Sequence, residues 1–415
     1  MPSEKPTPKP EADLGRPFRL TIEDLFGDLL WPKLFRVPRL ALRADRIGLA
    51  VLMILLIGLI DQTLASMTKA DDQPVLDMLF GLWSQRLDGI VISIQSLALG
   101  EALLAGWNAL HFAVIQTFEA APVRASIVLP ISMLIYISLA TGIARMSADD
   151  FARGQSMKWT EGLTWAIKSI PHALAAHLIP LAVIGLIVVV LAGGGAVLLG
   201  VPGLNLIGAV LSIIGIALAF VAVILMVGFG LGAPMLSPAV ACEGFDGIDA
   251  MQRVYAYIFG RPARWFIYSL VLVLQFIVVG SIVYALAAAT TSLASWAMGW
   301  WLGTDGTLVA SGVSSEEMTW AGKSAARIVA TVLKIPTLIA AGFVLVYWIS
   351  GWTVQYLLLR QSSDGQDVTD IYVPGEMEAR VELTLASRVA GIEMGQDAEA
   401  GESEDPEDSE ESEAD

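Results

Sequence analysis

Charged side chains are scarce in this sequence and absent from its longest apolar run. Only 16% of the 415 residues are Asp, Glu, Lys or Arg, whereas 55% are apolar. The stretch Leu206–Leu231 holds no charged residue in 26 positions. A soluble protein of this size needs more charge than this to cover its surface. The composition therefore excludes an ordinary soluble domain.

Cysteine and histidine are also rare, which removes several kinds of chemistry. The one cysteine, Cys242, excludes an internal disulfide and is typical of a small packing residue beside an apolar run. The three histidines form no H-E-x-x-H motif, and the glycine-rich runs AGGGA and GFGLGAP are not followed by GK[ST]. The sequence thus predicts no catalytic residue, no metal site and no cofactor.

Six apolar runs are long enough to cross a membrane, whose core of about 30 Å requires roughly 20 residues in a helix. The sequence predicts an all-α, polytopic helical membrane protein with a six-span domain over residues 47–357. The predicted spans are about 47–67, 125–143, 173–193, 206–231, 266–288 and 337–357. The third and fourth are joined by AVLLGVPGLNL, which predicts a helical hairpin.

The two ends of the chain differ from this domain. The stretch MPSEKPTPKPEADLG at the start lacks the apolar core of a cleaved signal peptide. Residues 1–46 are predicted to form a cytoplasmic segment with an amphipathic helix from Thr21 and a basic flank. Residues 358–392 form a predicted juxtamembrane segment. Segment 393–415 has 12 acidic residues and no basic one. It accounts for most of the net charge of −16, because the rest of the chain carries only −4. Such a composition favours a disordered tail, and its charge suits a basic protein partner.

Lysine and arginine near the span ends predict that both termini lie in the cytoplasm, because loops on that side are enriched in basic residues. Residues 89–116 leave an alternative open, since a seventh span there would reverse everything downstream. This stretch carries Gln95, Glu101 and Asn108, and we interpret it as a helix lying on or near the outer membrane face. The basic residues assigned to the inner side are Lys33, Arg36, Arg39, Arg43, Arg46, Arg145, Arg153, Lys158, Lys168, Arg253, Arg261 and Arg264.

Short amphipathic helices are predicted on the inner side before the third and fifth spans. Glu161 and Asp249 occupy comparable places in them, which predicts a direct repeat of span, surface helix and span. The alternative is that any inner loop near lipid tends to form such a helix. The predicted apolar faces contain Leu163, Ala166, Ile167 and Ile170 in one helix and Ile248, Met251, Tyr255 and Ile258 in the other.

Few polar residues interrupt the spans, and each has a structural interpretation. Gln275 lies deep in the fifth span and is expected to bond a neighbouring helix. Gly228 and Gly232 form a G-x-x-x-G motif that predicts close helix packing. Asp61 is expected near the far headgroups. Ion-coupled transport usually places ionisable groups inside spans, so this pattern disfavours an ion-coupled transporter.

Three stretches resemble a family of uncharacterised bacterial integral membrane proteins. They are GIARMSADDFARGQ, SPAVACEGFDGIDAMQRVYAYIFGRPARWFIYSLVL and YLLLRQSSDGQDVTDIYV, and the resemblance covers about Gly142 to Tyr372. More distantly, the pattern is similar to the membrane domains attached to some bacterial glycerophosphodiesterases, although no catalytic domain is present here. The resemblance implies the same topology and a location in the bacterial inner membrane, and it implies no activity.

The leading hypothesis from sequence is a non-enzymatic structural or regulatory component of the inner membrane. Its expected partners are membrane lipids, with no nucleic acid. The alternative is a small-solute transporter or lipid-handling protein, in which Arg261, Arg264, His172 and His177 contact anionic headgroups. For the histidines, the competing interpretation is two ordinary interfacial residues.

Overall fold

The computed structural model describes residues 30–68, 73–96, 98–244 and 246–373. Their regular structure is entirely helical, and six of the helices are long and apolar enough to cross a membrane. This confirms the all-α, multi-pass prediction, and each candidate span contains one of the six predicted runs. The predicted helix from Thr21 and the acidic segment 393–415 lie outside the described residues.

The helices follow one another with short connections. They are η1 (Trp31–Arg36), α2 (Val37–Ala41), α3 (Ala44–Thr68), α4 (Val75–Gln95), α5 (Leu99–Ala120), α6 (Pro122–Arg153), α7 (Trp159–Lys168), α8 (Ile170–Gly200), α9 (Asn205–Glu243), α10 (Gly247–Gly260), α11 (Pro262–Gly299), α12 (Thr304–Ala310), α13 (Trp320–Leu333) and α14 (Ile335–Asp364).

Local sequence explains where the spans begin and end. Proline occupies the first turn of α6, α8, α11 and α14, where its missing N–H is not needed. The helices α6, α9 and α14 are each followed by a glycine with positive φ, namely Gly154, Gly244 and Gly365. Only glycine adopts that conformation readily, so it ends the helix.

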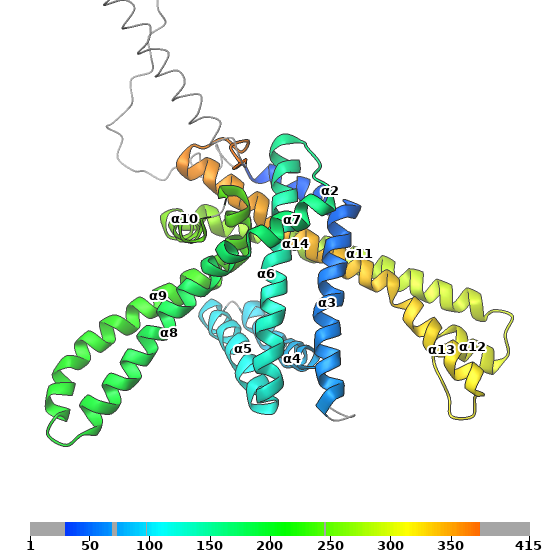
Figure 1. Ribbon diagram of the computed structural model, residues 1–415, viewed down its shortest axis with the longest axis horizontal. Helices are drawn as coiled ribbons and strands as arrows, with labels where there is room; N and C mark the ends of the chain where they lie inside the picture. The colour runs from blue at the N-terminus through cyan, green and yellow to red at the C-terminus, as the bar shows by residue number, and fades with distance from the viewer. Residues whose placement is uncertain (1–29, 69–72, 97, 245, 374–415) are drawn as a thin grey trace, which may run out of the picture.

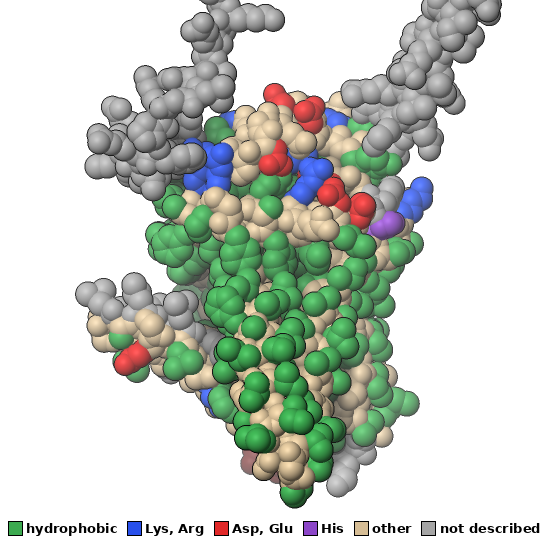
Figure 2. Space-filling view, turned by 90° about the vertical axis from the view of Figure 1, so that its left-hand side faces the viewer, with side chains coloured by type: hydrophobic (Ala, Val, Ile, Leu, Met, Phe, Trp, Pro, Cys, Tyr) green, Lys and Arg blue, Asp and Glu red, His purple; other side chains and the backbone are tan. Residues whose placement is uncertain are grey.

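The spans form three pairs that diverge from one common end (Figure 1). Helices α3, α8 and α11 run away from this end, and α6, α9 and α14 return to it. We call α6, α9 and α14 the returning helices. Charged side chains gather at the common end, whereas the body below it is covered by apolar side chains (Figure 2). We refer to it as the charged end.

The hydrophobic core lies at the charged end rather than in the middle of the spans. Ile143 of α6, Leu236 of α9 and Leu358 of α14 are fully buried there. In contrast, only 6% of the most apolar window of α9 and 11% of that of α11 is buried within the chain. Without lipid around them, such apolar surfaces would be strongly unfavourable in water. The diverging parts of the hairpins are therefore the lipid-facing parts.

The two short helices predicted before the third and fifth spans are α7 and α10. Helix α7 lies between α6 and α8, and α10 lies between α9 and α11, with Glu161 and Asp249 each at the third helical position. The predicted apolar faces are only partly buried. Ile167 and Ile248 stay exposed, while Trp165 and Val254 turn toward the protein. Ile167 and Ile248 therefore remain available to lipid, whereas Ala166 and Ile258 of the same predicted faces are buried against the spans.

One prediction about the segment between the first two spans needs correction. The single helix expected over residues 89–116 is divided between α4 and α5, which pack against each other, and neither is a candidate span. The structure also shows the partners of Asp61 toward the far end of α3. Asp61 is 3% exposed, and its carboxylate accepts hydrogen bonds from the backbone N–H groups of Val75 at 2.8 Å and Leu76 at 2.9 Å. The carboxylate thereby provides hydrogen-bond acceptors for two N–H groups in the first turn of α4, which have no partner within the helix.

Two packing predictions are confirmed. Helix α10 crosses α9 at the G-x-x-x-G motif, where a Cβ on Gly232 would lie 2.8 Å from Val254 and one on Gly228 would meet Tyr255. Only glycine allows this approach. In α11, Gln275 accepts a hydrogen bond of 3.1 Å from the Tyr347 hydroxyl of α14, which is the interhelical bond expected of it.

Candidate functional site

The most distinctive polar feature of the protein is a buried charge network where the three returning helices meet. It is built from the residues around the ends of α6, α9 and α14, which pack against one another. These ends carry the three stretches GIARMSADDFARGQ, SPAVACEGFD and YLLLRQSSDGQDVTDIYV. Segments more than 100 residues apart in the chain are thus joined by their charged side chains.

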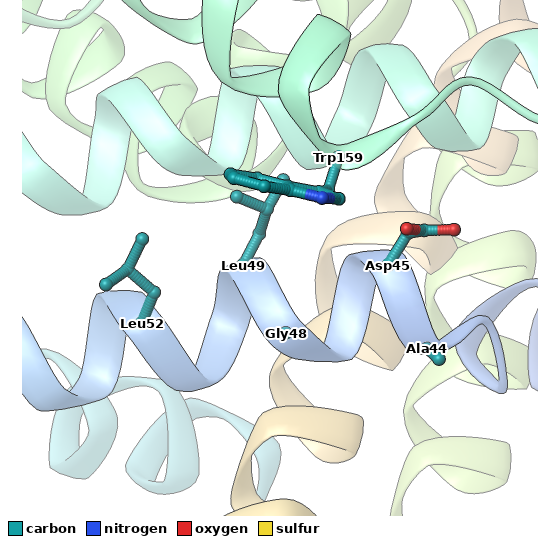
Figure 3. A pocket seen from close by; sticks show the side chains of 6 residues that line it. All are labelled: Ala44, Asp45, Gly48, Leu49, Leu52 and Trp159. Atoms are coloured by element: carbon teal, nitrogen blue, oxygen red, sulfur yellow. The ribbon is translucent and has the colours of Figure 1, made fainter.

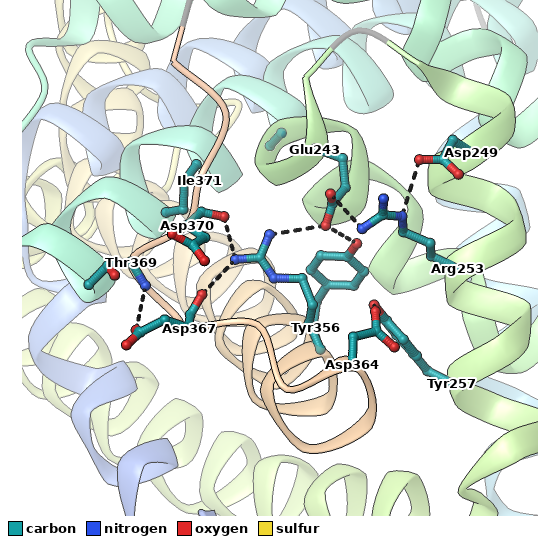
Figure 4. Close-up of polar contacts among 12 residues, drawn as sticks. Glu243, Asp249, Arg253, Tyr257, Tyr356, Asp364, Asp367, Thr369, Asp370 and Ile371 are labelled. Atoms are coloured by element: carbon teal, nitrogen blue, oxygen red, sulfur yellow. Dashed lines mark hydrogen bonds and ion pairs between the residues drawn. The ribbon is translucent and has the colours of Figure 1, made fainter. Parts of the chain in front are cut away.

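Arg360 of α14 and Glu243 of α9 form the centre of this network (Figure 4). The Arg360 side chain is 1% exposed, and its Nη1 lies 3.1 Å from Oε1 of Glu243. The same carboxylate accepts a 2.7 Å hydrogen bond from the Tyr356 hydroxyl and pairs with Arg253 at 2.9 Å. One glutamate therefore joins α9, α10 and α14.

Arg253 also pairs with Asp249 on its own helix, at 3.1 Å. Burial alone lowers the pKa of Arg253, but the negative charge of Glu243, with that of Asp249, outweighs it and raises the pKa above its usual value. The guanidinium therefore stays charged at every physiological pH.

A second part of the network lies on α6. Arg145 is 3% exposed, and its Nε lies 3.2 Å from the Asp149 carboxylate one turn later. Its Nη1 donates to the carbonyl of Ala241 on α9 at 3.1 Å. The guanidinium also lies 4.5 Å from the ring centroid of Trp165, a cation–π distance. Arg145 thus connects α6 with both α9 and α7.

The first span is fixed by a third arginine, Arg46, which is also 1% exposed. Its Nη2 lies 2.6 Å from the Asp150 carboxylate and 2.9 Å from the carbonyl of Met146. Its Nη1 donates to the carbonyl of Leu40 at 2.6 Å. Arg46 therefore ties the beginning of α3 to the end of α6.

The segment after α14 folds back over the network. Arg360 Nη2 donates to the carbonyls of Asp367 at 3.1 Å and Asp370 at 2.6 Å. The Tyr372 N–H donates to the carbonyl of Cys242 at 3.0 Å. The exposed Asp367 carboxylate accepts from the Thr369 N–H, which lowers the pKa of Asp367. We call residues 366–372 the covering segment.

This arrangement suits the joining of helices. Its buried arginines are engaged by carboxylates and backbone carbonyls of neighbouring segments. Among the residues that the structure describes, no cluster of three His, Cys, Asp or Glu side chains is placed to hold a metal ion.

The residues predicted from sequence to contact lipid headgroups are not gathered into one place. The His172 carbonyl lies against Gly247 at the start of α10, whereas Arg261 follows its end. A helix of 14 residues separates the two by roughly 20 Å. Arg261 is exposed, and Arg264 and His172 are half-buried. His177 is 5% exposed, with Nδ1 2.8 Å from the Ala173 carbonyl of its own helix.

Sequence reasoning treated Arg46, Arg145 and Arg253 only as markers of the inner side and gave Arg360 no role. The available signal was position, since Arg145 and Arg360 lie two and three residues beyond the ends of predicted spans. An ionisable residue at such a depth usually has a charged partner. Which partner it has depends on contacts between segments far apart in the chain, and the sequence alone does not show those.

Comparison of the chain with protein families, with curated proteins and with solved structures finds no match.

Proposed function

We propose that this protein is a non-enzymatic, structural or regulatory component of the bacterial inner membrane. One observation supports the proposal: Arg46, Arg145 and Arg360, all deeply buried, are used to join span ends. Unpaired charge at the edge of a membrane is costly, and a transporter places ionisable groups along its substrate path. A network that holds three hairpins at one end instead supports a rigid scaffold whose apolar arms extend into lipid.

Reconstitution of the full chain in liposomes tests this proposal. We expect ion conductance and the efflux of small fluorescent solutes to equal those of liposomes without protein, at several lipid-to-protein ratios. Insertion is checked separately by protease protection. A conductance or solute flux that depends on correctly inserted protein would overturn the structural role.

We infer further that the charged end faces the cytoplasm. Both described ends of the chain lie there, since Lys33 Nζ donates to Gln361 Oε1 at 3.4 Å. Basic residues on α7, α10 and the first turn of α11 lie on the same side, in agreement with the enrichment of cytoplasmic loops in Lys and Arg. Reporter fusions after residues 155 and 310 are expected to report opposite sides, with 155 in the cytoplasm. Equal signals would contradict the six-span arrangement.

Lipid handling is the second candidate function, and the diverging hairpins favour it. The lipid-facing sides of α8, α9 and α11 are apolar along their length, and Arg261 and Arg264 stand at the entry of α11. The double change Arg261→Ala and Arg264→Ala is expected to reduce the co-purification of anionic phospholipid. The matched control is Lys323→Ala with Arg327→Ala on α13. Equal recovery of anionic phospholipid with the unaltered protein, the arginine variant and the control variant would remove support for this candidate.

The family resemblance also remains a proposal. The stretches that carry it contribute Arg145, Asp149, Glu243 and Arg360, which lie together in the network. This grouping supports the idea that the related membrane domains share the same junction. The double change Glu243→Arg with Arg360→Glu places opposite charges at the two positions again. We expect the doubly changed protein to be more stable than either singly changed protein.

A further inference from the structure

A groove at the start of the first span is not used by the charge network. It lies between the first turns of α3 and the beginning of α7, and it has a volume of about 370 Å³. Trp159 covers one side, with its ring lying flat over α3 (Figure 3). The lining residues are Ala44, Asp45, Gly48, Leu49, Leu52 and Trp159.

The groove is open because a glycine, Gly48, lies at its floor. A Cβ on Gly48 would find no atom within 4 Å, so the floor of the groove is bare backbone. Leu52 is 37% exposed and Trp159 is 50% exposed. These apolar groups stand where α3 enters its candidate span, which begins at Ala44. Tryptophan is enriched at this depth because its ring is apolar and its N–H is polar.

Asp45 places a negative charge at one end of the groove. Its neighbours Arg43 and Arg46 both pair with Asp150, at 3.3 and 2.6 Å. The exposed Asp45 carboxylate makes no hydrogen bond or ion pair with the described residues, apart from a longer-range attraction to Arg46. In Figure 3, Asp45 lies toward the nitrogen edge of the Trp159 ring, and Leu52 lies at the other end.

We propose that this groove binds a phospholipid whose headgroup carries a primary ammonium group. Asp45 accepts charge-assisted hydrogen bonds from the ammonium, and the Trp159 ring adds a cation–π contact. The Trp159 N–H donates to a phosphate or ester oxygen. One acyl chain lies along Gly48 and Leu52, in the direction in which α3 enters the membrane.

The charge of Asp45 selects among lipids. An anionic headgroup with no amine is repelled by the carboxylate, which disfavours phosphatidylglycerol. A choline headgroup is cationic but has no N–H to donate to Asp45, so it makes only the cation–π contact with Trp159. The groove therefore fits phosphatidylethanolamine best. This site is separate from Arg261 and Arg264 and does not depend on either proposed function.

Native mass spectrometry of the full chain tests the site, with phosphatidylethanolamine, phosphatidylcholine and phosphatidylglycerol of equal chain length. We expect the first lipid to bind about tenfold more tightly than the other two, as a hydrogen-bonded charge pair allows. Asp45→Asn is expected to remove this preference and Asp45→Glu to keep it. Asp305→Asn, which changes an exposed first-turn aspartate of α12, is the matched control and should behave like the unaltered protein.

A second variant separates loss of the site from loss of the fold. Gly48→Leu fills the groove in open space, so we expect an unchanged melting temperature with loss of the tight phosphatidylethanolamine complex. Equal affinity for the three lipids in the unaltered protein would overturn the proposal. So would an Asp45→Asn or Gly48→Leu protein that still prefers phosphatidylethanolamine.

Discussion

Arg360 and Glu243 lie 117 residues apart in the chain, and their 3.1 Å ion pair joins the ends of α14 and α9. Each also holds a further element: Glu243 binds α10 through Arg253, and Arg360 binds the covering segment through two carbonyls. The pair is therefore the point at which the second and third hairpins and the end of the chain are held together.

Glu243→Gln is expected to destabilise the folded protein strongly. The change leaves Arg360 buried without its carboxylate, and removing one partner of a buried pair costs about 3–5 kcal/mol. Thermal unfolding of the purified protein in detergent measures the effect as a lower melting temperature. Glu316→Gln, at an exposed position, is the matched control and should shift stability by about 0.5 kcal/mol or less. Equal melting temperatures for the two variants would contradict a central role for Glu243.

Arg46 and Asp150 are expected to be energetically coupled. A double-mutant cycle with Arg46→Met and Asp150→Asn should give a coupling energy of about 1–3 kcal/mol, because the pair is direct and buried. Arg46→Met alone should cost more than Arg43→Met, since Arg43 is 46% exposed and exposed pairs contribute about 1 kcal/mol at most. Chemical unfolding in mixed micelles provides the free energies. Strict additivity would show that the pair does not act as a unit.

Two glycines of α9 provide a test of how α10 packs. Gly232→Ala places a methyl group 2.8 Å from Val254 and 3.0 Å from Ile258, and such overpacking costs about 1–3 kcal/mol. Gly230→Ala meets nothing within 4 Å and should be neutral or slightly stabilising, because alanine favours a helix. Melting temperatures in the same detergent compare the two. A Gly230→Ala protein less stable than the Gly232→Ala protein would contradict the observed contact.

Tyr255 is expected to ionise at unusually high pH. Its hydroxyl donates to the Leu225 carbonyl of α9 at 3.0 Å, and burial raises its pKa to about 12. The unfolded value is about 10. Because the folded pKa is the higher one, the stabilising contribution of neutral Tyr255 is complete below pH 10 and is lost as pH rises through 12.

The difference in phenolate absorbance between the unaltered protein and Tyr255→Phe isolates this one tyrosine. We expect its midpoint near pH 12 in folded protein and near 10 after denaturation. A midpoint near 10 in the folded state would show that the hydroxyl is solvated rather than held against α9.

Several elements were predictable because they depend on neighbouring residues alone. The six spans follow from the length of the apolar runs. The packing role of Gly228 and Gly232 and the hydrogen bond of Gln275 were also predicted correctly. Each prediction needs only local composition, since lipid imposes a helix on any apolar run of sufficient length.

The break between α4 and α5 and the role of Asp61 were not predictable in this way. Asp61 looked like an interruption near a span end, yet its carboxylate satisfies two N–H groups of a helix that begins 14 residues later. Its partner is fixed by the path of the chain between α3 and α4. A polar residue in an apolar run signals that a partner exists, but it does not identify the partner.

The sequence by itself determined that this chain is a helical, multi-pass membrane protein with neutral spans, because hydrophobicity over about 20 residues is enough to specify a span. Only the tertiary structure decided which charges meet. Arg46, Arg145 and Arg360 stand in three different spans, and their partners come from α6, α9 and the covering segment. The reason is physical: a buried charge requires a counter-charge within a few ångströms, and that proximity exists only once the three hairpins have converged.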